Sequence, residues 1–93
     1  MKLRIDANFV IPGLMNGSIE IDEASTVRRL LESISELSGK MLVFFERGQD
    51  TLDFEGWQVD LNGTPYEAIA AGLDTPLMKG DVVAIRLLPL TGG

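Results

Sequence analysis

Histidine and cysteine are both absent from this sequence of 93 residues. Without histidine the chain has neither the commonest general base nor the commonest metal ligand, and without cysteine it has no thiol nucleophile, no zinc thiolate and no disulfide. We therefore expect no catalytic side chain, no metal site and no permanently bound cofactor. Because no cysteine pattern indicates an oxidising compartment, the cytoplasm is the expected location.

Long apolar runs and an excess of positive charge are also missing. The longest uninterrupted apolar stretch, Met41 to Phe45, is far shorter than the roughly 20 residues that a membrane-spanning helix needs. Asp6 and Asn8 interrupt the first apolar segment, so a secretory signal is not expected. Fourteen acidic and eight basic side chains give a net charge of −6, which disfavours nucleic acid and anionic membranes as partners.

The first part of the chain has the pattern of a β-hairpin. Between Lys2 and Phe9 apolar and polar residues alternate, which predicts a strand with one face on a core. A proline-glycine pair and an asparagine-glycine pair follow, and a second alternation around Ile19 and Ile21 predicts another strand. We expect the two strands to pair antiparallel.

A helix is predicted after this hairpin, because from residue 25 the apolar period changes from two to about 3.6 residues. Ser25 or Thr26 can cap its start, and Gly39 suits a left-handed C-cap. The apolar stripe that should face the core consists of Val27, Leu30, Leu31, Ile34 and Leu37.

The second half of the chain predicts short strands and one ambiguous segment. Met41 to Phe45 could be a buried strand, and the polar residues from Arg47 to Gly56 predict a loop. The acidic side chains of this loop, Asp50, Asp53 and Glu55, lack the spacing of a calcium site and are interpreted as solvated. The other predicted elements are a strand at Trp57 to Leu61, a turn at Asn62 and Gly63, a short strand at Pro65 and Tyr66, a helical turn from Glu67 to Ala71 ended by Gly72, and a last strand from Val82 to about Leu88.

This order of elements predicts an α+β fold of the β-grasp (ubiquitin-like) class. A hairpin, a crossover helix and a final strand that can lie parallel to the first give a mixed sheet of four to five strands packed on one helix. Ninety-three residues are enough for one hydrophobic core and not for two. We expect one domain over residues 1–88.

The last five residues predict a flexible tail ending in Gly-Gly. Pro89 has no N–H to donate to a sheet, so strand pairing should stop near Leu88. Extended, residues 89–93 could reach roughly 16 to 18 Å beyond the domain. A run of leucines before two glycines is unusual at the end of a chain, where polar residues are more common. The tail can therefore act as an arm.

Several segments resemble one family, which comprises the molybdopterin synthase small subunit and the thiamine-pathway sulfur carrier (the MoaD/ThiS family). The resemblance extends over nearly the whole chain and is most specific in its C-terminal third. Residues 40–57 do not match the family pattern, and Arg86 stands where molybdopterin-pathway members usually have an apolar residue. The matching segments are Thr26 to Leu31, Asp60 to Gly63, Gly72 to Leu77, Gly80 to Val83, and Pro89 to Gly93.

The resemblance implies that the chain is a carrier or a non-catalytic synthase subunit, with Gly93 as its reactive residue. A partner activating enzyme would use ATP to adenylate the Gly93 carboxylate, and a sulfur donor would convert the adenylate to a thiocarboxylate. Pro89, Leu90, Thr91 and Gly92 would be recognised as the tail enters the activating enzyme. An acceptor synthase subunit would then receive the sulfur, in the synthesis of molybdopterin or a related cofactor, or of thiamine.

The last strand also suggests where such partners dock. Its alternation turns Val83, Ile85 and Leu87 to one face and the intervening residues to the other. We expect this second face to be an exposed apolar patch containing one arginine, which suits a transient interface, although both faces could instead be buried. The expected docking residues are Val82, Ala84, Arg86 and Leu88.

Two other functions remain open. A ubiquitin-like modifier would use the same adenylated Gly93 and form an isopeptide bond with a lysine of another protein. A non-covalent β-grasp interaction domain would use neither glycine of the tail. The sequence does not separate the first of these from a sulfur carrier.

Overall fold

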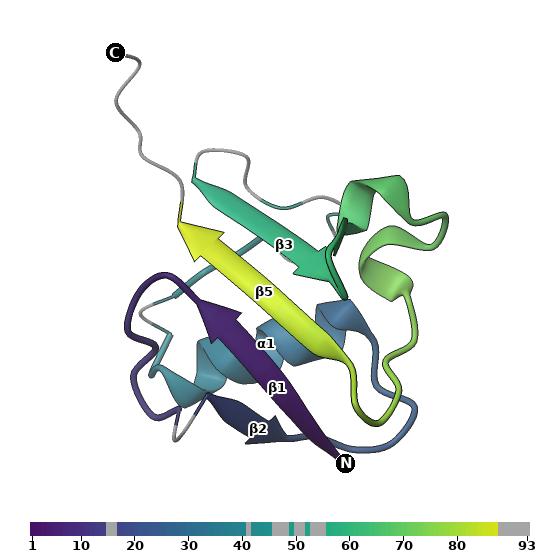
Figure 1. The fold of residues 1–93 in the computed structure, drawn as a ribbon. Coiled ribbons are helices and arrows are strands. Elements are labelled where there is room, and N and C mark those ends of the chain that lie inside the picture. The colour runs from purple at the N-terminus through teal and green to yellow at the C-terminus, as the bar shows by residue number, and fades with distance from the viewer. Residues whose placement is uncertain (15–16, 41, 46–48, 50–51, 53–55, 88–93) are drawn as a thin grey trace.

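Five strands form one mixed sheet in the order β2-β1-β5-β3-β4 (Figure 1). The computed structural model describes residues 1–14, 17–40, 42–45, 49, 52 and 56–87. Its elements are β1 (Lys2–Ala7), β2 (Ser18–Glu20), α1 (Val27–Leu37), β3 (Trp57–Leu61), β4 (Thr64–Pro65), the 3-10 helices η1 (Tyr66–Ala68) and η2 (Gly72–Asp74), and β5 (Val82–Leu87).

The last strand, β5, lies in the middle of the sheet. It pairs parallel with β1 and antiparallel with β3, while β2 and β4 complete the sheet as antiparallel edge strands. The first hairpin, the single crossover helix and the parallel β1–β5 pair are the features of a β-grasp fold, as the sequence predicted.

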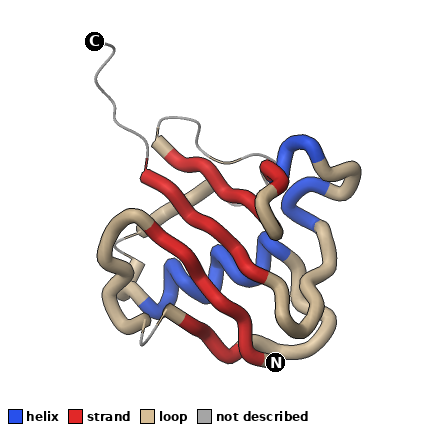
Figure 2. The backbone as a smooth tube through the Cα atoms, in the orientation of Figure 1, coloured by secondary structure: helices blue, strands red, loops and turns tan. Residues whose placement is uncertain are grey.

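The hydrophobic core lies between α1 and one face of the sheet, and the helix crosses behind that face in Figure 2. The helix buries its predicted apolar stripe except at the C-terminal end, where Leu37 is 43% exposed. From the sheet, the least exposed side chains are Leu3, Val59, Val83 and Ile85. Burial of apolar surface between these two layers is the main stabilising term of such a fold.

Both ends of α1 are closed by specific hydrogen bonds. Of the two predicted N-caps, Thr26 is the one used, since its side chain accepts a hydrogen bond from the Arg29 amide at 3.2 Å. At the other end Gly39 has a φ of 68°, and the amides of Gly39 and Lys40 donate to the carbonyls of Glu36 and Ser35. This pair of bonds is a Schellman motif and confirms the predicted glycine stop.

Two predictions for the second half of the chain are wrong in detail. Residues 42–45 form no strand; only Phe44 of this described segment is buried, and Val43 is 58% exposed. The ring of Phe44 packs on the ring of Trp57, with their centroids 4.6 Å apart, and this contact anchors the segment. The backbone of residues 42–45 pairs with none of the described strands. Gly72 begins η2 instead of ending a helical turn. The acidic loop residues Asp50, Asp53 and Glu55 lie outside the described residues.

One arginine joins the helix to the loops on both of its sides. Arg28 donates from Nε to Asp74 Oδ1 at 2.9 Å and hydrogen-bonds the carbonyl of Gln49. Its guanidinium also lies 5.5 Å from the centroid of the Phe45 ring, within range of a cation–π contact. The hydrogen bond from Arg28, with its positive charge, lowers the pKa of Asp74 from the ordinary value of 3.8. Arg28 and Asp74 come from two of the segments that carry the family resemblance.

The Arg28–Asp74 pair predicts a pH dependence of stability. The pKa of Asp74 is lower in the folded protein than in the unfolded chain, so the ionised carboxylate stabilises the fold. This stabilisation is fully present above the unfolded-state pKa and is lost as the pH falls through the folded-state pKa. We expect Asp74→Asn to remove this part of the acid destabilisation, measured as the free energy of unfolding in urea at a series of pH values. Glu67→Gln, which alters an exposed carboxylate without an ion pair among the described residues, should keep the wild-type slope. An Asp74→Asn profile identical to wild type would show that the pair does not contribute.

Candidate functional site

The described part of the candidate site is the face of β5 turned away from the helix. Val83 and Ile85 are fully buried against the helix side, whereas Val82 and Ala84 are half-buried and Arg86 is exposed on the other side. This arrangement matches the alternation read from the sequence. Among the described residues no helix or strand covers this outer face, so the alternative in which both faces are buried is wrong.

The tail and the end of the predicted docking set lie outside the described residues. Leu88 and the whole predicted tail, Pro89, Leu90, Thr91, Gly92 and Gly93, belong to this part of the chain. The alternation of the sequence predicts that Leu87, the final described residue, faces the core, but its side chain is 47% exposed. Leu87 lies two residue pairs beyond Val59 and Ile85, opposite Trp57, which is itself only half-buried.

The outer face is not the apolar patch that the sequence predicted. In the register of the sheet, Ala84 lies between Asp6 on β1 and Asp60 on β3. Arg4 lies beside Val82, and Gln58 lies beside Arg86. The small apolar residues of β5 are therefore bordered by charged and polar side chains from both neighbouring strands.

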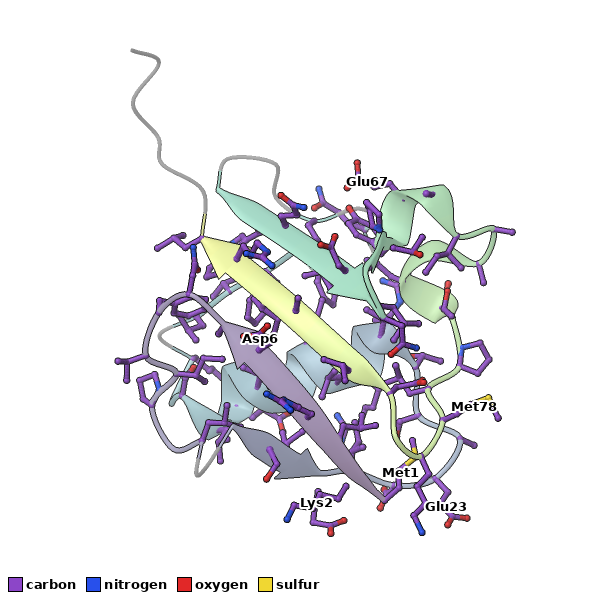
Figure 3. The ribbon with its side chains drawn as sticks, viewed as in Figure 1. Met1, Lys2, Asp6, Glu23, Glu67 and Met78 are labelled. Carbon is purple, nitrogen blue, oxygen red and sulfur yellow. The ribbon has the colours of Figure 1, made fainter. Side chains whose placement is uncertain are left out.

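These neighbours give the outer face a defined charge pattern. Two carboxylates lie across its middle, and Arg4 and Arg86 lie toward opposite ends of the β5 row. Figure 3 labels Asp6 where β1 runs beside β5. A shallow groove of about 700 Å³ runs along β1, β2 and the start of β5, and Arg4 and Val82 are among its lining residues. The face can thus be recognised by charge as well as by shape.

An asparagine–aspartate pair holds the start of β5. Asn62 Oδ1 accepts a hydrogen bond from the backbone N–H of Val82 at 2.9 Å, and the backbone N–H of Asn62 donates to the Val82 carbonyl at 2.8 Å. The Asn62 side chain also donates to Asp81 at 3.0 Å, and Asp81 accepts from the Met78 amide. Both residues belong to segments that carry the family resemblance, and here they join the β3–β4 turn to the first residue of β5.

A second asparagine holds the end of β5. Asn8 Oδ1 accepts a hydrogen bond from the Leu87 amide at 2.8 Å, and Asn8 Nδ2 donates to the Leu87 carbonyl at 3.2 Å. The sequence alone does not single out this residue, because Asn8 occupies an ordinary polar position in the predicted first strand. No motif marks it, and its partner is 79 positions away.

The described residues contain no cluster of three or more metal-ligating side chains of the His, Cys, Asp and Glu types. Within the same part of the chain, every buried side-chain nitrogen or oxygen has a hydrogen-bond partner. None of the helices described is long and apolar enough to cross a membrane.

Comparisons with known proteins agree with this fold. Neither models of protein families nor curated proteins match the chain. Among solved structures, it is similar to a Pyrococcus furiosus protein provisionally assigned as molybdopterin converting factor, subunit 1, with a TM-score of 0.64 and 26% identity over 95% of this chain and 98% of that one. It is also similar to the Haloferax volcanii protein HVO 2177, with a TM-score of 0.70 and 26% identity over 100% of this chain and 87% of that one.

A matched pair of substitutions tests which side chains β5 turns outward. Val83→Thr places a hydroxyl among fully buried apolar neighbours, which should cost about 1–3 kcal/mol of unfolding free energy. The same change at the half-buried Val82 should cost less than about 0.5 kcal/mol, because its hydroxyl can reach water. Chemical denaturation measures both. Equal losses would show that the outer face of β5 is covered in solution.

Proposed function

We propose that this protein is a sulfur carrier that acts with a molybdopterin-type synthase, and that Gly93 is its reactive residue. The observation that supports the proposal most strongly is the structural likeness over nearly the full length of both chains to the Pyrococcus furiosus protein assigned as molybdopterin converting factor, subunit 1. The sequence adds a Gly-Gly pair, Gly92 and Gly93, a short distance along the chain from Leu87, where the central strand β5 ends.

In this proposal the carboxylate of Gly93 carries the chemistry. It attacks the α-phosphate of ATP on a partner activating enzyme, forming an acyl adenylate and releasing pyrophosphate. Hydrosulfide supplied by a sulfur donor then attacks the carbonyl carbon, AMP leaves with the electron pair of the C–O bond, and loss of the proton leaves a thiocarboxylate on Gly93. This soft nucleophile delivers its sulfur to a substrate held by an acceptor synthase subunit. The carrier provides the reactive group, and its partners provide the catalytic side chains.

The residue types of the tail suit this role. Gly92 and Gly93 have no Cβ, so an enzyme can close around the backbone and bring the carboxylate to ATP without a steric obstacle. Pro89, Leu90 and Thr91 provide side chains by which the partner can recognise the tail. The absence of histidine and cysteine is no handicap, because no side chain of the carrier takes part in the reaction. The need for ATP agrees with a cytoplasmic location.

Docking of the domain would use the outer face of the sheet. Val82 and Ala84 provide a small apolar strip, and Arg4, Asp6, Asp60 and Arg86 provide charges at fixed register positions around it. In this proposal Leu88 also takes part in docking. A face that is both small and charged suits an interface that must form and dissociate in each cycle, because charge pairs at a rim favour fast association.

The chemistry is tested by intact-protein mass spectrometry. The protein is incubated with ATP, a sulfide source and the adenylating enzyme of the same organism. We expect the wild-type chain, ending at Gly93, to gain the mass difference between sulfur and oxygen. Deleting Gly93 or adding one residue after it should abolish the gain, while thermal unfolding stays unchanged because neither edit alters the core.

Three outcomes would count against this function. Conjugates on lysines of other proteins would indicate a ubiquitin-like modifier. No modification by any adenylating enzyme of the organism would favour a non-covalent interaction domain. A chain extended past Gly93 that still gains sulfur would show that the reactive carboxylate belongs to another residue.

The docking face is tested by reversing one of its charges. Arg86→Glu should weaken binding to the activating enzyme about tenfold or more, which corresponds to about 1.4 kcal/mol. Arg29→Glu is the control, because Arg29 is an exposed arginine on α1, on the opposite side of the sheet. It makes the same change in net charge. Calorimetric titration of both variants measures the two affinities, and an equal loss in both would mean that only net charge matters.

A further inference from the structure

We propose that Asn8 is a positioning residue that sets the direction in which the chain leaves the sheet after Leu87. The importance of this direction for activity rests on the proposed function, but the structural claim does not. Asn8 is the residue directly after β1, and its side-chain amide binds both backbone groups of Leu87, the last residue of β5.

The side chain of Asn8 acts here as a substitute for strand β1. The β1–β5 ladder has its last register pair at Ala7 and Ile85. Backbone groups alternate in direction along a strand, so Leu87 directs its N–H and C=O to the same side as Ile85, toward β1. Since β1 ends at Ala7, the amide of Asn8 provides the acceptor and the donor that a further strand residue would otherwise provide.

The position of Asn8 is itself fixed by aromatic packing. The next residue, Phe9, has its ring 5.5 Å from the ring of Trp57, centroid to centroid. Trp57 is the cross-strand neighbour of Leu87 and donates from Nε1 to the Val43 carbonyl at 3.1 Å. The end of β5 is thus held from both sides, by Asn8 through hydrogen bonds and by Trp57 as its partner in the sheet.

Both hydrogen bonds of Asn8 are exposed to solvent, so they add little to overall stability. Their effect is local, because they fix the peptide groups on either side of Leu87. A carrier must present its tail to a narrow passage, and each free orientation at the exit adds an entropic cost to binding. Loss of Asn8 should therefore weaken productive binding of the tail without changing the reaction once the tail is bound.

The structure contains a matched control at the other end of the same strand. Asn62 holds Val82 as Asn8 holds Leu87, with its side-chain oxygen on the amide of the terminal strand residue. Asn62→Ala removes that bond at the end of β5 where the tail does not leave. Asn8→Asp is a second variant, since it keeps an acceptor for the Leu87 amide and loses the donor to the Leu87 carbonyl.

The first readout is backbone NMR on the free protein. In Asn8→Ala we expect amide hydrogen exchange at Leu87 to accelerate about tenfold or more, with the Leu87 order parameter lowered, because the bond that protects this amide is removed. Asn62→Ala should affect Val82 and leave Leu87 unchanged. Unchanged exchange and order at Leu87 in Asn8→Ala would overturn the proposal, whether or not the protein carries sulfur.

The second readout is the kinetics of adenylation by the activating enzyme used above. Asn8→Ala should raise the KM for the carrier about three- to tenfold with kcat within about twofold, as expected for lost binding without lost chemistry. The KM of Asn8→Asp should fall between those of Asn8→Ala and wild type. Asn62→Ala is used for the NMR comparison alone, because it also alters Val82 on the proposed docking face. A KM for Asn8→Ala equal to that of wild type would show that Asn8 has only a structural role. If the wild-type chain is not adenylated, the proposed function fails, and the NMR result alone decides the role of Asn8.

Discussion

The whole structure depends on the position of β5 between β1 and β3. This strand hydrogen-bonds to a parallel neighbour on one side and an antiparallel neighbour on the other, and its inward residues Val83 and Ile85 are completely buried under α1. A strand bonded on both edges and buried on one face is among the last parts of a domain to open. The chain segment that follows β5 therefore starts from a rigid base.

That base separates the tasks of the chain. The inward face of β5 contributes to stability, its outer face presents small apolar residues among charges, and its two ends are held by asparagine side chains. In the proposed function, the only reactive group is the backbone carboxylate of Gly93, which needs no side chain of its own protein. A domain with neither histidine nor cysteine can serve such a reaction, because it only has to hold and present one end of the chain.

Local patterns predicted most of the fold, and contacts between distant strands explain what they missed. Alternation and the 3.6-residue period indicated four strands and the helix, and a glycine after Ser38 indicated where the helix ends. The charges bordering Ala84 come from β1 and β3, so they follow from register, which the pattern of one strand does not contain. The sequence does not mark Asn8 for the same reason, because its partner Leu87 lies on a strand 79 positions away. The segment at residues 42–45 looked like a strand because apolar runs do not distinguish paired backbone from a loop anchored by Phe44.

The central claim is that sulfur is carried on the last residue of the chain, and one peptide tests it directly in protein isolated from its own organism. Tryptic cleavage after Arg86 releases the segment from Leu87 to Gly93, which contains no other cleavage site. If the protein is a sulfur carrier, a fraction of this peptide will end at Gly93 with one oxygen replaced by sulfur. If the peptide is recovered only with a plain carboxylate, joined to a lysine, or continuing past Gly93, the protein is not the carrier described here.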